Sequence, residues 1–231
     1  MNQYHSIAID GPSGAGKSTL ARALAREMGY LYVDTGAIYR TVGLAVQRRG
    51  LDPQDPQAVE QVLGQVDITM GYGEDGQQRM YLDGEDVSQA IRQHVISRYA
   101  SQVAALAPVR AFLLNKQRHL AENHNVIMDG RDIGTVVLPQ ADVKIFLTAD
   151  PEDRARRRYL ELLERGQQAD LEQILADVVE RDRQDMERAI APLKKAEDAT
   201  VVDTTGKDLE ESRKLLLEAI RSKLGAGEVH P

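Results

Sequence analysis

Cysteine is absent from the 231-residue sequence. A chain without cysteine forms no disulfide bond and no cysteine-ligated metal site, and this composition is typical of a reducing cytosol. The first ten residues show no basic segment followed by an apolar one, and no window approaches the roughly 18 apolar residues that a membrane span needs. We therefore expect a cytoplasmic protein without thiol redox chemistry, export signal or membrane anchor.

A surplus of positive charge is missing as well, because 29 lysines and arginines face 36 aspartates and glutamates and give a formal charge of −7. Nucleic-acid-binding proteins draw their affinity from a net basic surface, so this charge argues against nucleic acid as a partner. The arginines nevertheless gather at Arg154–Arg158 and at Arg181–Arg188. Each cluster fits either a solvated helix face or a local site for a small anion.

Short β-branched segments alternate with helical patterns along most of the chain. The predicted strands are Ser6–Asp10, Tyr30–Asp34, Asn125–Asp129, Val143–Leu147 and Thr200–Asp203. The predicted helices are Lys17–Met28, Ala37–Arg49, Pro151–Arg165, Asp170–Arg188 and Leu209–Leu224, after which the tail from Gly225 is expected to fray. This alternation predicts an α/β fold in which helices cover both faces of a parallel sheet.

Two segments depart from this alternation. Between Val66 and Val87, apolar and polar residues alternate around several glycines, which predicts a small antiparallel insertion. The two charged helices predicted between Pro151 and Arg188 are joined by a glycine-containing loop. Such a helix pair could act as a mobile lid.

The segment Gly11-Pro-Ser-Gly-Ala-Gly-Lys17-Ser18 matches G-x-x-x-x-G-K-[ST] and lies between a predicted strand and a predicted helix, where this phosphate-binding loop, the P-loop, occurs. Its glycines let successive backbone N–H groups point inward, and the helix N-terminus adds a partial positive charge. Lys17 is expected to bridge the β- and γ-phosphates of ATP, and the Ser18 hydroxyl to ligate Mg²⁺. The predicted ATP-binding residues are Gly11, Pro12, Ser13, Gly14, Ala15, Gly16, Lys17, Ser18 and Thr19.

A P-loop alone does not separate a kinase from a GTPase or a mechanical ATPase. A GTPase would also carry the guanine-reading pattern N-K-x-D. The nearest segment, Asn115-Lys-Gln-Arg118, lacks the aspartate and lies within a helical pattern. The rest of the chain therefore has to indicate the class.

Two polar segments follow predicted strands, at the edge where open α/β sheets bind ligands. They are Asp34-Thr-Gly-Ala-Ile-Tyr-Arg40 and Asp129-Gly-Arg-Asp-Ile-Gly-Thr-Val-Val137. Together with the P-loop, Ser101-Gln-Val-Ala104 and Arg181-Asp-Arg-Gln-Asp-Met-Glu-Arg188, they closely resemble the bacterial cytidylate kinases over about residues 7–203. Two positions depart mildly from that family, because Thr35 and Ser18 stand where many members have serine and glycine.

The resemblance implies an ATP-dependent kinase for CMP and dCMP in pyrimidine nucleotide metabolism. The residues that it assigns to CMP binding are Thr35, Arg40, Ser101, Arg110, Arg131, Asp132, Arg181, Asp185 and Arg188. Within this set, the acceptor phosphate is assigned to Arg40, Arg131 and Arg188, cytosine to Ser101, Arg110 and Asp132, and the ribose end to Arg181 and Asp185. The residues assigned to catalysis are Lys17, Arg131, Arg158 and Arg188.

The resemblance also implies the P-loop NTPase fold with a monophosphate-binding insertion and an arginine-bearing lid. We expect one P-loop kinase over residues 1–231, with a core of about 1–65 and 96–225, the insertion at about 66–95 and the lid at about 151–170. The protein is expected to be a monomer. Two alternatives stay open: a kinase for uridylate, thymidylate or adenylate, and a nucleotide-dependent switch without an acceptor. Asp129 is expected either to orient Mg²⁺ through water or to cap its loop, and for Asp10 the structural role is favoured.

Overall fold

The computed structural model describes residues 4–224, and the expected fraying from Gly225 lies outside this range. The chain divides into two compact units. One contains the residues up to Tyr32 and those from His124 onward, and the other is Val33–Asn123.

A five-stranded sheet forms the centre of the first unit, in the order β2-β6-β1-β7-β8. Its strands are β1 (Ser6–Asp10), β2 (Leu31–Asp34), β6 (Val126–Gly130), β7 (Val143–Thr148) and β8 (Thr200–Asp203). β1 pairs in parallel with β6 and β7, and β7 pairs in parallel with β8. Every residue of β1 and β6 is buried, as expected for the central strands of a sheet covered on both faces. The predicted parallel α/β sheet is confirmed.

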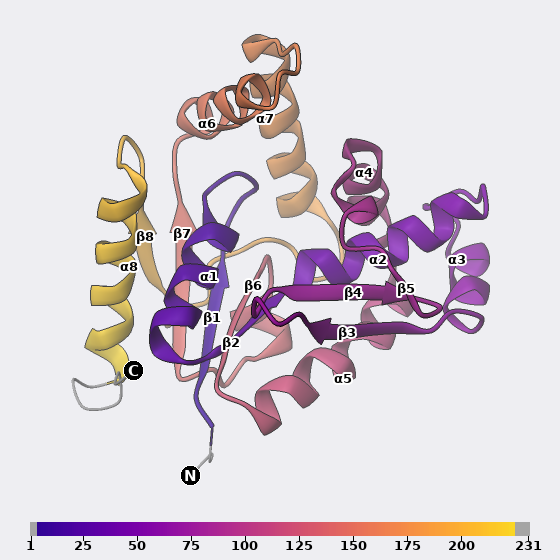
Figure 1. Cartoon of the computed structure of the whole chain (residues 1–231), viewed down its shortest axis with the longest axis horizontal. Coiled ribbons are helices and arrows are strands. Elements are labelled where there is room, and N and C mark those ends of the chain that lie inside the picture. The colour runs from indigo at the N-terminus through magenta and orange to yellow at the C-terminus, as the bar shows by residue number, and fades with distance from the viewer. Residues whose placement is uncertain (1–3, 225–231) are drawn as a thin grey trace. The chain divides into compact units, whose positions relative to one another are not determined.

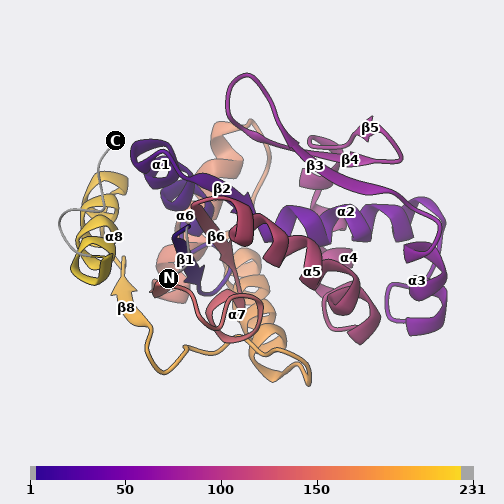
Figure 2. The same cartoon turned by 90° about the horizontal axis from the view of Figure 1, so that it is seen from below.

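Two helices of this unit pack together against the sheet, as Figures 1 and 2 both show: α1 (Lys17–Met28) and α8 (Leu209–Leu224). Leu20 and Leu24 of α1 recur at helical spacing and are buried, and Leu216 and Ile220 of α8 do the same. They join Ile9, Ile145 and other strand residues in one apolar core. This core fixes α1, and with it the loop that precedes α1.

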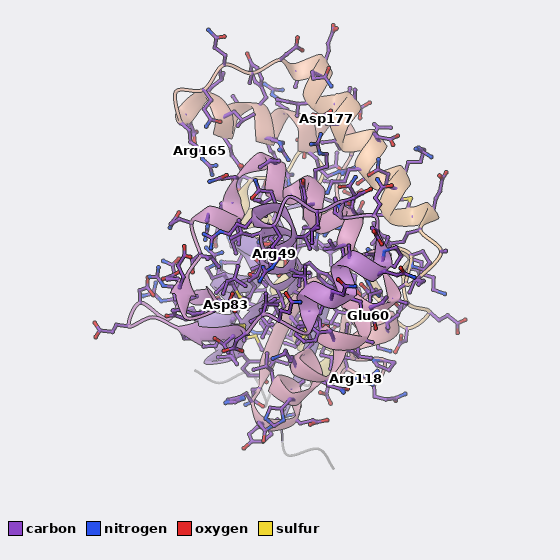
Figure 3. The ribbon with its side chains drawn as sticks, turned by 90° about the vertical axis from the view of Figure 1, so that its right-hand side faces the viewer. Arg49, Glu60, Asp83, Arg118, Arg165 and Asp177 are labelled. Atoms are coloured by element: carbon purple, nitrogen blue, oxygen red, sulfur yellow. The ribbon has the colours of Figure 1, made fainter. Side chains whose placement is uncertain are left out.

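The charged helix pair consists of α6 (Pro151–Glu164) and α7 (Leu171–Glu187). Only a small apolar cluster lies between these two helices, and its buried members are Ala155, Ile174 and Val178. Figure 3 labels two exposed residues of this pair, Arg165 at the end of α6 and Asp177 on α7. The outside of the pair thus carries charged residues, as the sequence predicts, together with exposed apolar residues such as Leu160 and Val179.

The second unit contains a three-stranded sheet, β3-β4-β5, formed by β3 (Ile68–Tyr72), β4 (Gln78–Leu82) and β5 (Glu85–Asp86). Both of its pairings are antiparallel, which confirms the predicted insertion. The helices of this unit are α2 (Thr35–Arg48), α3 (Pro56–Leu63), α4 (His94–Val103) and α5 (Ala107–Asn123), with a 3₁₀ turn at Ala90–Arg92. α2 begins two residues earlier than predicted, because the Asp34 side chain caps it by accepting from the Ala37 N–H. Among the described residues, no helix is long and apolar enough to cross a membrane.

Candidate active site

The P-loop occupies residues 11–16, between the end of β1 and the start of α1. Gly11 has φ of 151°, and a Cβ at this position would lie 1.9 Å from the Leu147 carbonyl oxygen on β7. Gly14 has φ of 76°, in the left-handed region. Glycine is therefore required at Gly11 by space and favoured at Gly14 by backbone conformation. The resulting loop ends at the N-terminus of α1, where N–H groups and the helix dipole favour an anion.

Lys17 is the first residue of α1, and its side chain is buried. The Nζ donates a hydrogen bond of 2.6 Å to the Pro12 carbonyl oxygen of the same loop. Burial and the nearby charge of Arg131 lower the pKa of Lys17 from 10.5 to about 7, although Asp129 and Asp10 oppose this change. A lysine whose pKa is lowered by burial within a phosphate-binding loop is a candidate functional residue.

The buried carboxylate of Asp129, near the end of β6, faces the P-loop helix. The Ser18 hydroxyl donates to Oδ2 at 2.8 Å, and the Tyr32 hydroxyl donates to Oδ1 at 3.0 Å. A serine hydroxyl and an aspartate next to a P-loop form the oxygen pair that holds Mg²⁺ in P-loop enzymes. The sequence singled out Ser18 and Asp129, whereas Tyr32 carried no signal because it reads only as part of a strand.

Asp10 connects the end of β1 to the turn that follows β6. Its Oδ1 and Oδ2 accept from the backbone N–H groups of Ile133 and Gly134, both at 2.8 Å. These residues begin a π-helical turn, Ile133–Val137, directly after Asp132. Burial raises the pKa of Asp10 to about 6, and the two backbone hydrogen bonds oppose this rise. Asp10 therefore has the favoured structural role: it holds the turn next to Arg131 and Asp132.

Two ion pairs connect this turn to α7. Arg131 Nε donates to Asp185 Oδ2 at 2.7 Å, and one Nη of Arg188 lies 3.2 Å from Asp132 Oδ1. Arg188 also donates through Nε to the Ala191 carbonyl oxygen at 2.6 Å. The structure thus brings together four residues that the sequence assigned to the acceptor, and it places both arginines on the same turn-and-helix surface.

Burial opposes the charges in this cluster, but the opposite charges outweigh burial. The pKa of Arg131 is raised because the carboxylates of Asp185 and Asp129 overcome its desolvation. The pKa of Asp185 is lowered because Arg131, Arg181 and Arg188 overcome the desolvation of that carboxylate. The cluster therefore keeps its ionic form, with several guanidiniums near one buried carboxylate.

The remaining predicted residues of the first unit lie on its helices. Arg181 is half-buried on α7, one turn before Asp185, and Arg158 is half-buried on α6. Thr19 is exposed on the first turn of α1. No group of three or more acidic or histidine side chains among residues 4–224 could hold a metal ion without further ligands.

In the second unit, the start of α2 is held by side chains. Arg40 pairs with Asp34 at 2.8 Å, and Thr35 is buried at the first position of the helix. The side-chain amide of Gln78, on β4, forms two hydrogen bonds to the backbone of Asp34: Oε1 accepts from its N–H at 2.7 Å and Nε2 donates to its carbonyl oxygen at 3.2 Å. The small sheet therefore fixes the segment that carries Thr35 and Arg40. Gln78 gave no signal in the sequence, because it is an ordinary polar residue of a half-exposed strand.

The two residues of this unit that the sequence assigns to cytosine binding lie on α4 and α5, which follow each other in the chain. Ser101 is half-buried on α4, and Arg110 is buried on α5. Arg110 donates to the Ala104 carbonyl oxygen at 3.1 Å, and its guanidinium carbon lies 5.8 Å from the centre of the Tyr39 ring on α2. The guanidinium is thus oriented by a carbonyl and an aromatic face.

Comparison with known proteins identifies a matching family profile and several relatives. The sequence profile described as cytidylate kinase matches residues 7–222. A cytidylate kinase of Caldicellulosiruptor bescii is 49% identical over 213 residues, which cover 92% of this chain and 94% of that protein. A cytidylate kinase of Geobacter sp. (strain M21) is 48% identical over 223 residues, covering 96% of this chain and 95% of that protein.

Among solved structures, an uncharacterized protein from Eubacterium ventriosum ATCC 27560 is similar in fold. Its TM-score is 0.52 at 13% identity, and the match covers 94% of this chain and 99% of that one. At this identity the likeness concerns the fold alone.

Proposed function

The chain belongs to the cytidylate kinase family, and from this premise we propose that it transfers the γ-phosphoryl group of ATP to CMP and dCMP, giving ADP with CDP or dCDP. The observation that carries the proposal is the arginine cluster of Arg131 and Arg188, held by buried carboxylates in the same unit as the P-loop. A switch protein needs a phosphate-binding loop but not a second set of guanidiniums for an acceptor phosphate.

On the donor side, residues Gly11 to Thr19 would bind ATP. The backbone N–H groups of the loop would surround the phosphates, and Lys17 would exchange the Pro12 carbonyl for phosphate oxygens. Phosphate charge next to Lys17 favours its protonated form and so opposes the effect of burial on its pKa. Binding of ATP would thus restore the charge that the reaction requires.

The oxygen pair of Ser18 and Asp129 fits Mg²⁺, which prefers oxygen ligands and usually shares one or two protein oxygens with substrate phosphates. We propose that Ser18 ligates the ion and that Asp129, oriented by Tyr32, supports it. When bound, Mg²⁺ would neutralise charge on the phosphates.

On the acceptor side, Arg131 and Arg188 would bind the CMP phosphate, because planar guanidiniums form paired hydrogen bonds to phosphate oxygens. Arg181 and Asp185 would contact the ribose, and Asp132 would read the cytosine amino group. From the second unit, we propose Thr35 for CMP binding, Arg40 for the phosphate, and Ser101 and Arg110 for the base. We also propose that residues 66–95 form the monophosphate-binding insertion and residues 151–170 the lid.

Catalysis would consist of positioning and charge stabilisation. The acceptor is an ionised phosphate, so no general base is needed. Lys17, Arg131, Arg158 and Arg188 would stabilise the charge on the transferred phosphoryl group. Closure of the lid would exclude water, whose attack on ATP is the competing reaction.

We further propose that the protein acts as a monomer in the cytoplasm. The absence of cysteine fits a reducing compartment, because the chain forms no disulfide bond.

The first prediction concerns the acceptor. In a coupled assay of ADP formation with MgATP, CMP and dCMP should be phosphorylated with a kcat/KM at least about tenfold above that for UMP, dTMP or AMP, because a buried reader of the cytosine edge leaves unpaired groups with the other bases. Without an acceptor, ADP should form only slowly. Equal use of UMP would indicate a different pyrimidine kinase, and rapid ADP formation without any monophosphate would contradict acceptor chemistry altogether.

A further inference from the structure

Arg154 lies on α6 within the arginine cluster, yet its side chain is only 3% exposed. All three of its nitrogens bond to protein acceptors. Nε donates to the Ala149 carbonyl oxygen at 2.8 Å, one Nη donates to the Ser13 carbonyl oxygen at 2.8 Å, and the other donates to Asp182 Oδ2 at 2.6 Å. Arg154 therefore differs from its neighbours on α6: it is part of the framework.

The bond to Ser13 acts on the P-loop itself. In a planar trans peptide, the carbonyl oxygen and the following N–H point in opposite directions. Because Arg154 holds the Ser13 carbonyl, the Gly14 N–H must point away from Arg154. A Cβ on Gly14 would lie 3.4 Å from the Arg154 Cβ, so the loop packs directly on this side chain. Arg154 thus fixes the orientation of one peptide in the phosphate cradle.

The bond to Asp182 acts on α7. Asp182 follows Arg181 and precedes Asp185 by three residues, so fixing it sets the rotation of the helix that presents both side chains. The pair is buried, with side-chain exposures of 3% and 12%. The Oδ1 atom of Asp182 is buried without a hydrogen-bond partner among the described residues. Arg154, which donates to the Oδ2 atom, is therefore the hydrogen-bonded counter-charge of this carboxylate. Because few apolar residues lie between α6 and α7, we expect the ion pair of Arg154 and Asp182 to set the rotation of α7.

We propose that Arg154 is a positioning residue that holds the P-loop through Ser13 and α7 through Asp182. One side chain therefore orders a donor-binding element and an acceptor-binding element of the same unit. The acceptor half of this inference rests on the proposed function, whereas the donor half depends only on nucleotide binding at the P-loop.

The test compares Arg154→Lys, Arg154→Met and Asp182→Asn with Arg183→Met as a control. Arg183 is an exposed arginine of α7 that pairs with Glu180 and Glu187. Lysine keeps a cation for Asp182 but cannot donate to three separate acceptors, so Arg154→Lys should fold even if Arg154→Met does not. Circular dichroism identifies a temperature at which each variant is folded, and all measurements are made there.

Calorimetric titration with Mg²⁺ and the β,γ-imido analogue of ATP, without any acceptor, measures the donor half. We expect Arg154→Lys to weaken this binding by about tenfold, because the loss of one hydrogen bond from a charged group lowers affinity by about that factor. Asp182→Asn and Arg183→Met should stay within about twofold of the parent. Parental affinity in Arg154→Lys would overturn the donor half.

Steady-state kinetics measure the acceptor half. Asp182→Asn should raise the KM for CMP by about fivefold or more with a smaller change in kcat, because α7 loses its charged anchor. Arg183→Met should leave both constants unchanged. An unchanged KM in Asp182→Asn would overturn the acceptor half. A parent protein that binds the analogue but phosphorylates no CMP would contradict the proposed function and leave the donor half standing on calorimetry.

Discussion

Asp132 has two possible partners, and both matter for its role. Its Oδ1 lies 3.2 Å from an Nη of Arg188, so the carboxylate orients an arginine proposed for the phosphate. Cytosine also presents an amino donor that a carboxylate can accept, whereas uracil presents a carbonyl at the same place. One residue could therefore serve both phosphate and base.

Replacing Asp132 with asparagine separates these roles. Asp132→Asn keeps the shape but offers an NH₂ to uracil, so the ratio of kcat/KM for CMP over UMP should fall by about tenfold, mainly through loss of CMP use. The measurement is steady-state kinetics with both acceptors. The control is Asp177→Asn, at an exposed position on α7 (Figure 3). Equal losses with CMP and UMP would limit Asp132 to orienting Arg188.

Among the secondary-structure elements, β4 has an unexpected role. Its Gln78 bonds to both the N–H and the carbonyl oxygen of Asp34, at the point where β2 ends and α2 begins. Asp34 caps α2 and pairs with Arg40, so the strand indirectly sets the position of that arginine. The middle strand of the small sheet therefore supports a segment proposed to bind the acceptor phosphate.

Gln78→Glu tests this support with a nearly isosteric change. The carboxylate cannot donate to the Asp34 carbonyl oxygen and adds a negative charge beside the Asp34 side chain, so we expect the KM for CMP to rise by about tenfold while kcat changes less. Gln77→Glu, at the adjacent exposed position, adds the same charge and should behave like the parent. If both variants match the parent in KM for CMP, Gln78 has no positioning role.

In the molecule as a whole, stability and activity conflict at the P-loop. Asp10 and Lys17 are both buried in the first unit. Burial favours the neutral form of Asp10 in the folded state. The stability that this group contributes is fully present below pH 3.8 and is lost as pH rises through about 6. The stability from neutral Lys17 is complete above pH 10.5 and is lost as pH falls through about 7. Near pH 7 the folded protein therefore carries buried charge at Asp10 and Lys17, which lowers its stability. An apolar residue at either position would carry no such charge.

Lys17→Met should accordingly be more stable and inactive. We expect its Tm at pH 7 to exceed that of the parent by about 5 °C. The difference should shrink towards pH 10, because the unfolded parent loses the proton that favours unfolding as pH approaches 10.5. Turnover should fall by at least about a thousandfold. Thermal unfolding across this pH range measures the first effect. Lys214→Met, at a 65% exposed position, should show neither. A Tm difference that grows with pH would contradict the assigned direction of the pKa change.

The sequence by itself determined the features that depend on neighbouring residues. The P-loop between Asp10 and Lys17 needs only glycines, a preceding strand and a following helix, and all three are local patterns. The same holds for the parallel sheet and the antiparallel insertion, because side-chain periodicity reports which faces are buried. The segments that carry Arg131 and Arg188 were instead assigned through the resemblance to the cytidylate kinases, because the ordered set of motifs is specific to that family.

Only the tertiary structure decided which charged groups meet. Arg131 and Asp185 are 54 residues apart in the chain, and Arg154 and Asp182 are 28 apart. No local pattern distinguishes Arg154, which is buried on framework carbonyls, from Arg158 on the same helix. Hydrogen bonds of this kind depend on the packing of separate elements, which places donors and acceptors within about 3 Å of each other. For that reason the sequence indicated candidate residues for the site, while their partners came from the fold.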